Sequence, residues 1–397
     1  MFVELHILQN FAPSNLNRDD TGSPKDCEFG GYRRARVSSQ CLKRAIRSRF
    51  SSEGGLQQGE LGKRTKRLVD ELVKRLQDKR KDPVQARPVV ETALRGLGLG
   101  LNDDGKTEYL LFLGEAEMRR VADVCAECWD TLVEAAAAAA SAAGTGQSGR
   151  GAGAKDAKKS GKEAVPVEVK KALETVLDGG LAADLALFGR MVADRPDKNV
   201  DAACQVAHAI STNKVSTEFD FYTAVDDLKP DDIAGADMLG TVEFNSACFY
   251  RYANIDVEQL KNNLGGGEEL ARKTIEAFIR ASVVAVPTGK QNSMAAQNPP
   301  SFVMAVARER GLWSLANAFA RPVRPDGSGD LVENSIAALD GYWGRLCTMY
   351  GNNGIVGPWY VSLDGAKLKC VGECAGNVDK LVEGVMVAVK FAKEAQA

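Results

Sequence analysis

The chain has 397 residues, enough to bury a sizeable core, and its 44% hydrophobic and 26% charged residues are typical of globular proteins. The formal net charge of −2 excludes a uniformly basic nucleic-acid-binding protein, so any cationic surface must be local. The N-terminal sequence MFVELHILQNF lacks the basic flank and cleavage site of a signal peptide, and polar residues interrupt it too early for a membrane span. We therefore expect a cytoplasmic protein with no membrane partner.

The nine cysteines are odd in number and lie in a long chain, which argues against a disulfide framework. Cys125 and Cys128 have the spacing of zinc ligands, but their segment is expected to be one continuous helix. Only Cys370 and Cys374 could supply a distant second pair. We interpret all of them as reduced cysteines, with zinc binding as the alternative, and predict no metal and no cofactor.

The N-terminal part of the chain predicts a strand, a loop and a helix. Residues 1–10 alternate loosely between apolar and polar side chains, as in a strand. Residues 11–37 carry Pro, Asn, Asp and Gly and are expected to form a long loop. Ser38 and Ser39 then offer N-cap oxygens to a helix over residues 40–50.

A long charged region follows. Residues 56–90 are expected to be helical, and within residues 63–81 nine basic residues stand against three acids. Residues 135–163 are an Ala/Gly-rich tract that cannot anchor in a core and is expected to be an exposed tip of a helical region. The later elements expected in chain order are helical patterns from 165 through 200–212, a β-rich stretch at 218–227, a strand pair at 239–252, and helices at 268–284 and 311–320.

This order of elements predicts an α+β fold. Strands alternate irregularly with helices, and a long helical region interrupts them. A palm of the RNA-recognition (ferredoxin-like) type with a large helical insertion fits that order.

The most informative segment is residues 30–50, GGYRRARVSSQCLKRAIRSRF, with seven basic residues and no acid. Gln40, Lys43, Arg44 and Arg47 recur at helical spacing and share one face, while the other face is apolar. A cationic helix face, with free N–H groups at its N-terminus, favours phosphate. The alternative is a solvated basic face, but ordinary helices interleave acids with bases, so we predict a nucleic-acid contact.

Asp19 and Asp20 lie in the loop before this helix. They could hold Mg²⁺ and activate water for RNA cleavage. Alternatively they could cap a turn or pair with neighbouring arginines, which we favour. The chain carries no phosphate-binding loop, zinc-protease motif or nucleophile elbow. His6, expected on a strand, and His208, expected in an apolar helix, are interpreted as packed histidines.

The whole set of motifs resembles a known family, the CasC-type backbone subunits (RAMP superfamily) of type I-E CRISPR Cascade surveillance complexes. The matching segments are SNLNRDD (14–20), FGGYRRARVSSQCLKRAIR (29–47), FGRM (188–191), VDAACQVAHAIST (200–212), FYTAVDDL (221–228), LGTVEF (239–244), CFYRYANI (248–255) and LANAF (315–319). They occur in the family's order along nearly the whole chain.

The resemblance implies a hand-like protein with a modified RNA-recognition palm, helical fingers and a β-hairpin thumb. The palm would comprise residues 1–56, 204–214 and 249–397, the fingers residues 57–203, and the thumb residues 215–248. The resemblance also implies partners: a crRNA guide, target DNA held as an RNA–DNA heteroduplex, further copies of the chain in a helical filament, other Cascade subunits and, indirectly, a recruited nuclease.

The resemblance assigns site residues by matching position. Contacts to the guide backbone would come from Arg18, Ser38, Gln40, Lys43, Arg44 and Arg47. Residues inserted at a displaced base would be Met191, Tyr222, Thr223 and Leu239, which by their sequence pattern alone would be assigned to the core. Lys290 and Gln291 fall in a matched loop near RNA. In the fingers, Lys155, Lys158, Lys159 and Lys162 are candidates for holding DNA, or part of a solubilising insertion.

The resulting hypothesis is a non-catalytic RNA-binding subunit that polymerises along the guide. The first alternative is a backbone subunit of an RNA-targeting effector, which would cut RNA with Asp19 or Asp20 and Mg²⁺. The second is a free-standing RNA-binding module, which would remain a monomer on RNA.

Overall fold

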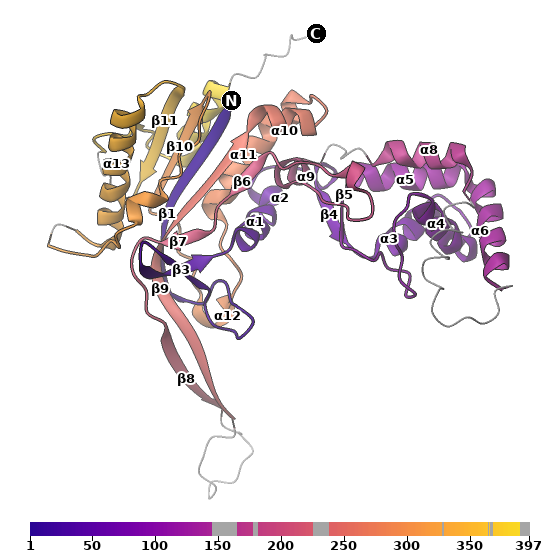
Figure 1. The fold of residues 1–397 in the computed structure, drawn as a ribbon, viewed down its shortest axis with the longest axis horizontal. Coiled ribbons are helices and arrows are strands. Elements are labelled where there is room, and N and C mark those ends of the chain that lie inside the picture. The colour runs from indigo at the N-terminus through magenta and orange to yellow at the C-terminus, as the bar shows by residue number, and fades with distance from the viewer. Residues whose placement is uncertain are drawn as a thin grey trace, which may run out of the picture. The chain divides into compact units, whose positions relative to one another are not determined.

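The computed structural model describes residues 1–144, 165–177, 182–224, 238–327, 329–363, 365 and 368–389. It divides into two compact units. The first comprises residues 1–55, 204–258 and 272–397, and the second comprises residues 56–203 and 259–271. The first is built on a large sheet and the second is mainly helical, so the predicted α+β class is confirmed (Figure 1).

A single large sheet forms the first unit. Its main path runs β12-β11-β10-β1-β9-β7-β3-β2, and β6 and β8 also pair with β9. Among the described strands of this sheet, β11 pairs with β12 in parallel and the other pairings are antiparallel. The strands are β1 (Phe2–Ser14), β2 (Asp26–Phe29), β3 (Tyr32–Val37), β6 (Cys204–Val206), β7 (Ala209–Ser211), β8 (Glu218–Ala224), β9 (Met238–Asp256), β10 (Phe302–Arg308), β11 (Ile355–Ser362) and β12 (Glu373–Cys374).

Both faces of this sheet are covered, because alternate side chains of β9 meet different helices. Tyr250 belongs to an apolar cluster with Ile336 and Trp343 of α13 (Leu331–Tyr350). Arg251, the next residue, donates to the backbone oxygen of Ser282 in α11 (Glu268–Val284) at 2.7 Å. Further helices of this unit are α1 (Ser39–Arg47), α2 (Phe50–Glu53), α12 (Gln291–Met294) and α14 (Val378–Val389). Helix α10 (Val257–Asn263) begins in this unit, but from Gln259 on it belongs to the second.

Several predicted elements are confirmed, namely the first strand, the helix that Ser38 caps, and the helix at 268–284. The loop predicted at 11–37 is wrong, because it contains the β2–β3 hairpin. Gly30 and Gly31 turn that hairpin with φ of +62° and +78°, the left-handed region that a tight two-residue turn requires.

The predicted helical pattern at 200–212 is also wrong. This segment forms β6 and β7, because pairing with β9 satisfies its backbone groups and overrides the local pattern. The expected strand pair at 239–252 is part of one strand, β9, and in 311–320 only the 3-10 helix Ala316–Phe319 forms.

The second unit is a helical bundle with a small two-stranded sheet. Its core gathers Leu72, Leu76, Val90, Leu94 and Val121 from three helices. The expected continuous helix around Cys125 is interrupted at Cys128, where α5 ends. The elements are α3 (Leu68–Asp78), α4 (Pro83–Gly96), α5 (Glu115–Glu127), α6 (Trp129–Gly144), α8 (Val167–Val176), α9 (Ala183–Phe188), β4 (Gly62–Thr65), β5 (Leu111–Gly114), and the 3-10 helices Gln58–Glu60 and Pro196–Lys198.

A long hairpin projects from the first unit (Figure 1). β8 pairs with the first part of β9, from Met238 to Phe244, and β9 then continues into the middle of the sheet. The hairpin is therefore an extension of a central strand, which fixes its direction relative to the sheet. No described helix is long and apolar enough to cross a membrane.

Candidate nucleic-acid interface

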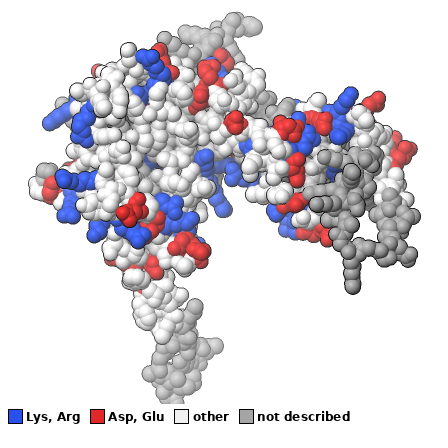
Figure 2. Space-filling view, in the orientation of Figure 1, with Lys and Arg blue, Asp and Glu red and all other residues white. Residues whose placement is uncertain are grey.

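An open cleft of about 840 Å³ lies in the first unit beside the N-terminal part of α1. It is lined by the loop after β1, the side of α1, and the loop before α12. The lining residues are Leu16, Asn17, Arg18, Asp19, Asp20, Thr21, Gly22, Ser38, Gln40, Cys41, Arg44, Ala45, Ser48, Pro287, Thr288 and Gly289. Four of the predicted RNA-contacting residues, Arg18, Ser38, Gln40 and Arg44, thus meet in one cleft. Figure 2 shows Lys and Arg side chains on this unit near the base of the hairpin, interspersed with Asp and Glu.

Helix α1 presents its polar face as the sequence predicts. Ser38 has extended backbone angles, and its Oγ accepts the N–H of Cys41 at 3.3 Å, so it is the N-cap. Leu42, Ala45 and Ile46 are buried on the opposite face. Of the predicted basic residues, Arg44 is exposed, whereas Lys43 and Arg47 are half-buried and do not line the cleft.

The N-terminus of α1 has fewer free N–H groups than the sequence suggests. The N–H of Ser39 donates to Nδ1 of His208 at 3.1 Å, and the N–H of Cys41 is taken by Ser38. His208 is an exposed residue between β6 and β7, so its predicted place in an apolar helix is wrong. Partial burial and the nearby charges of Arg36 and Lys25 lower the pKa of His208 and favour the neutral imidazole.

The loop that carries Arg18 is held by its own side chains. Oδ1 of Asp19 accepts the N–H and hydroxyl of Thr21 at 2.9 and 2.8 Å and the N–H of Ser23 at 2.9 Å. The hydrogen bond from the Thr21 hydroxyl is the main cause that lowers the pKa of Asp19. Asn15, fully buried, closes the loop by donating to the backbone oxygens of Gly22 and Glu243 at 3.0 and 2.9 Å. Asp19 therefore fills the turn-capping role that its sequence context favours.

The third wall of the cleft approaches this loop closely. A Cβ at Gly289 would lie 2.4 Å from the backbone oxygen of Leu16, so only glycine fits there without displacing backbone. The predicted RNA residue Lys290 follows in the left-handed region, with φ of 50°. The amide of Gln291 donates to the backbone oxygens of Pro287 and Ala296 at 2.9 and 3.2 Å, which holds the loop together.

Several of the basic residues in 30–50 have partners within the fold, among them Arg33, Arg34 and Arg36, whose Nε donates to the backbone oxygen of Asp26 at 3.2 Å. Arg34 is fully buried, and its guanidinium donates to the backbone oxygens of Thr212 and Phe319 at 2.7 and 2.6 Å. Arg33 forms an exposed ion pair with Asp26 at 2.8 Å. The count of basic residues thus overstates the charge available to a phosphate, although Arg18 restores part of it.

The hairpin exposes the residues that the resemblance assigns to a displaced base. Leu239 is 63% exposed, and Tyr222 and Thr223 are also exposed, so their assignment to the core from the sequence pattern is wrong. Thr223 pairs with Leu239, and Tyr222 pairs with Gly240. Because paired residues share a face and successive residues alternate, Tyr222 lies on the face opposite to Thr223 and Leu239.

Two further aromatic residues were missed by the sequence reasoning. Phe219 and Phe221 are 67% and 65% exposed, and they lie on the same hairpin face as Thr223. The alternation of aromatic residues in EFDFYT was the available signal. Apolar side chains exposed on both faces of a hairpin are suited to stacking against bases.

Met191 belongs to the second unit, where it is 78% exposed. The preceding residue, Arg190, forms a buried ion pair with Glu117 at 2.8 Å and a backbone bridge to Val200. A Cβ at Gly189 would lie 2.8 Å from the backbone oxygen of Val200. These contacts hold an exposed apolar side chain on a firmly anchored backbone.

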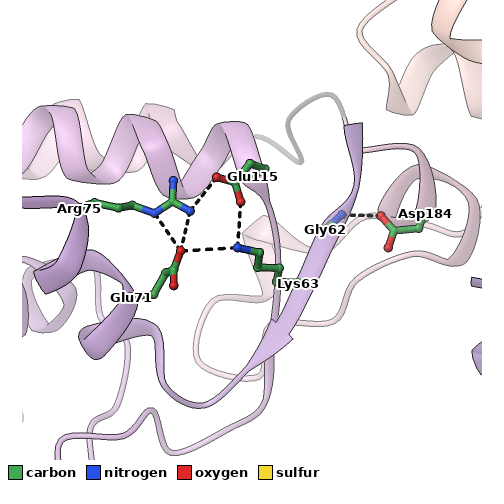
Figure 3. A network of polar contacts seen from close by, with 6 residues as sticks. All are labelled: Gly62, Lys63, Glu71, Arg75, Glu115 and Asp184. Atoms are coloured by element: carbon green, nitrogen blue, oxygen red, sulfur yellow. Dashed lines mark hydrogen bonds and ion pairs between the residues drawn. The ribbon is translucent and has the colours of Figure 1, made fainter. Parts of the chain in front are cut away.

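The basic run at 63–81, also in the second unit, faces acids. Arg75 lies 2.7 Å from Glu71 and 2.6 Å from Glu115, and Lys63 lies 3.3 Å from Glu115 (Figure 3). Beside them, Asp184 accepts the N–H of Gly62 at 2.7 Å. Lys79 in the same run also pairs with an acid, Asp123, at 2.7 Å, so ion pairs neutralise part of this run.

The described residues contain no group of three or more His, Cys, Asp or Glu side chains placed to hold a metal ion. Burial raises the pKa of the Cys125 thiol to about 12, as expected for an inert, reduced cysteine. The candidate DNA-binding residues Lys155, Lys158, Lys159 and Lys162 lie outside the described part of the chain.

A family profile and two solved structures each match this chain over almost its whole length. The profile of the CT1975-like protein family matches residues 3–383. A chain of a solved structure described as "CRISPR RNA-guided surveillance complex, pre-nicking" superimposes with a TM-score of 0.83 at 28% identity, covering 98% of this chain and 100% of that one. A chain of a second, described as "CRISPR RNA-guided surveillance complex", has a TM-score of 0.72 at 24% identity with the same coverage and supports the fold alone. The comparison with curated proteins finds no match. The family match spans far more than half of the chain, which therefore belongs to the CT1975-like protein family.

Proposed function

We propose that this protein is a crRNA-binding backbone subunit of a Cascade-type CRISPR surveillance complex. The observation that carries the proposal is the cleft, which combines Arg18, Gln40 and Arg44 with the capped N-terminus of α1. Cations and polar donors along an open groove bind a phosphate backbone without reading its sequence. The solved structure that shares 28% identity is part of an RNA-guided complex, which supports the same role.

The finer features of the proposal concern assembly. Copies of the chain bind head to tail along one guide RNA in a type I-E complex, with other Cascade subunits at its ends. The exposed hairpin residues Tyr222, Thr223 and Leu239 lie against the guide and displace a base at intervals. The guide bases between the hairpins then pair with target DNA, and a separately recruited nuclease acts on that DNA.

We further propose that the subunit is not catalytic. Supporting this view, the Asp19 carboxylate accepts three hydrogen bonds within its own turn. The alternative, RNA cleavage by Asp19 or Asp20 with Mg²⁺, is tested by incubating the assembled complex with Mg²⁺ and complementary RNA. Cleavage that Asp19→Ala or Asp20→Ala abolishes would establish the alternative.

The deciding experiment is co-expression with neighbouring genes and a guide array, followed by sizing and extraction of bound nucleic acid. A large particle with several copies of this chain and RNA of uniform length is the expected result. A one-to-one complex with RNA would favour the free-standing module, and a nucleic-acid-free monomer would contradict the proposal.

A further inference from the structure

His208 occupies an unusual position for a histidine next to a cationic helix. It lies between β6 and β7, and its Nδ1 accepts the N–H of Ser39, the first residue of α1, at 3.1 Å. The nearest Arg36 nitrogen, Nη1, lies 3.4 Å from the same Nδ1. Since N–H groups and a guanidinium can only donate, Nδ1 must be the unprotonated nitrogen, and the proton must lie on Nε2.

This contact adds to two others at the start of α1, the first of which is the hydrogen bond from the N–H of Cys41 to Oγ of Ser38. On the other side, the N–H of Ser38 donates to Oδ1 of Asn17 at 2.8 Å, beside Arg18 in the cleft loop. His208 in turn is anchored by its neighbours, because Ala209 pairs with Val37 of β3 and Ile210 pairs with Tyr250 of β9. The imidazole thus ties the first turn of α1 to the sheet, and Asn17 ties it to the cleft loop.

We infer that His208 is a positioning residue that holds α1 in register with the cleft by capping Ser39. The inference rests on the proposed function, since it concerns how the guide-contacting face of α1 is presented. Gln40 and Arg44 reach the cleft from the first two turns of a helix of nine residues. A short helix frays easily from its N-terminus. Loss of the contact to His208 is therefore expected to loosen the first turn of α1, where Gln40 is the second residue.

Substitution of His208 is expected to weaken RNA binding more than it destabilises the fold. His208 is exposed, so its removal leaves no cavity in the core. The apolar residues that hold the rest of α1, Leu42 and Ile46, do not contact the lost group and stay buried. Unfolding midpoints of His208 variants should therefore remain close to that of the wild type, whereas the order of the first turn changes.

Three substitutions of His208 in the full chain distinguish the role of Nδ1 from that of Nε2–H. In His208→Asn the amide oxygen can take the place of Nδ1 and keep the cap, but no group replaces Nε2–H. In His208→Gln the amide nitrogen can replace Nε2–H, but the cap is lost, and His208→Ala removes both. Hydrogen exchange of the peptide covering α1 is measured without RNA, and affinity is measured with single-stranded guide RNA.

We expect His208→Gln and His208→Ala to speed exchange in the first turn of α1 and weaken RNA binding about fivefold, as for one lost N-terminal cap. His208→Asn should restore both quantities nearly to the wild-type values. If His208→Asn behaves like His208→Ala, or if none of the three changes exchange, the inference is wrong. If His208→Gln retains affinity and His208→Asn loses it, the imidazole contacts RNA through Nε2–H, which also overturns the positioning role.

The exchange measurement keeps this inference distinct from the proposed function. If the wild-type protein binds no RNA, the proposed function fails, while exchange in the RNA-free protein still tests whether His208 caps α1. Conversely, wild-type RNA binding with no effect of any His208 variant overturns only the positioning role.

Discussion

Two stretches of this chain are rich in basic residues, and folding gives them different surroundings. Residues 30–50 contain seven basic residues and no acid, and residues 63–81 contain nine basic residues and three acids. From the first stretch, Arg44 reaches an open cleft where Arg18 joins it. In the second stretch, Lys63 and Arg75 meet Glu71 and Glu115.

The difference arises from acids that are distant in sequence. Glu115 and Asp123 lie on α5, outside the second stretch, yet they lie 2.6 Å from Arg75 and 2.7 Å from Lys79. A basic side chain is available to nucleic acid only where it is not already paired with a carboxylate of the fold. Within the first stretch, Arg34 is also unavailable, because its guanidinium donates to the buried backbone oxygens of Thr212 and Phe319.

The largest expected effect concerns that buried arginine. Arg34→Met should lower the free energy of unfolding by about 3 kcal/mol, because several buried carbonyl groups lose their donors. Arg33→Met, one residue away in an exposed ion pair, should cost less than about 0.5 kcal/mol. Urea unfolding of both variants checks the contrast, and equal losses would show that burial does not separate the two arginines.

The second effect concerns the cleft. Arg18→Ala combined with Arg44→Ala should weaken binding of guide RNA by about 2 kcal/mol, or roughly thirtyfold. The slope of log affinity against log salt should fall by about 1.4, as for two lost contacts to single-stranded phosphate. The matched control is Lys63→Ala with Lys79→Ala, two ion-paired residues of the second stretch, where little change is expected. A larger loss in the control would reverse the assignment of the two stretches.

A third experiment extends the comparison to the exposed, uncharged residues of the hairpin. Tyr222→Ala with Leu239→Ala should leave guide binding intact but weaken pairing with target DNA about tenfold, because each stacked base contributes about 1–3 kcal/mol. Target capture by the assembled complex is the measurement, with Asp220→Asn on the same hairpin as the control. Unchanged capture in the double variant would contradict the role of the hairpin.

The smallest effect concerns two acids that pair with the second stretch, Glu71 and Glu115. A hydrogen bond from Arg75 is the main cause that lowers the pKa of Glu71. For Glu115, burial raises the pKa, but the hydrogen bond and charge of Arg75, aided by Lys63, outweigh it and the pKa is lowered. Because both folded-state values are lowered, the stabilisation is present above the ordinary pKa of 4.5 and is lost as the pH falls below it.

We expect this loss to be about 1 kcal/mol after allowance for solvent screening. The free energy of unfolding of the wild type, measured from neutral pH to about pH 3.5, is compared with that of Glu71→Gln combined with Glu115→Gln. The double variant should have a flatter pH dependence in this range. Parallel curves would show that the ion pairs add nothing measurable.

The sequence by itself determined the local features of the site. The apolar and basic faces of α1 follow from helical periodicity, and Ser38 is the cap that residue type and position predict. The first strand and α11 follow from their patterns in the same way. Asp19 holds a turn, as its loop context suggests. These features depend on contacts within a few residues, which periodicity and capping rules describe well.

Only the tertiary structure decided which distant residues meet. Arg18 and Arg44 share a cleft because the loop after β1 folds against α1, and Gly289 closes it by an approach that no local pattern encodes. The segment around His208 became strands because β9 offers backbone partners, and the pairing of β8 with β9 left Tyr222 and Leu239 exposed. The physical reason is common to all three: backbone pairing, burial and charge compensation depend on neighbours in space, which a one-dimensional pattern does not contain.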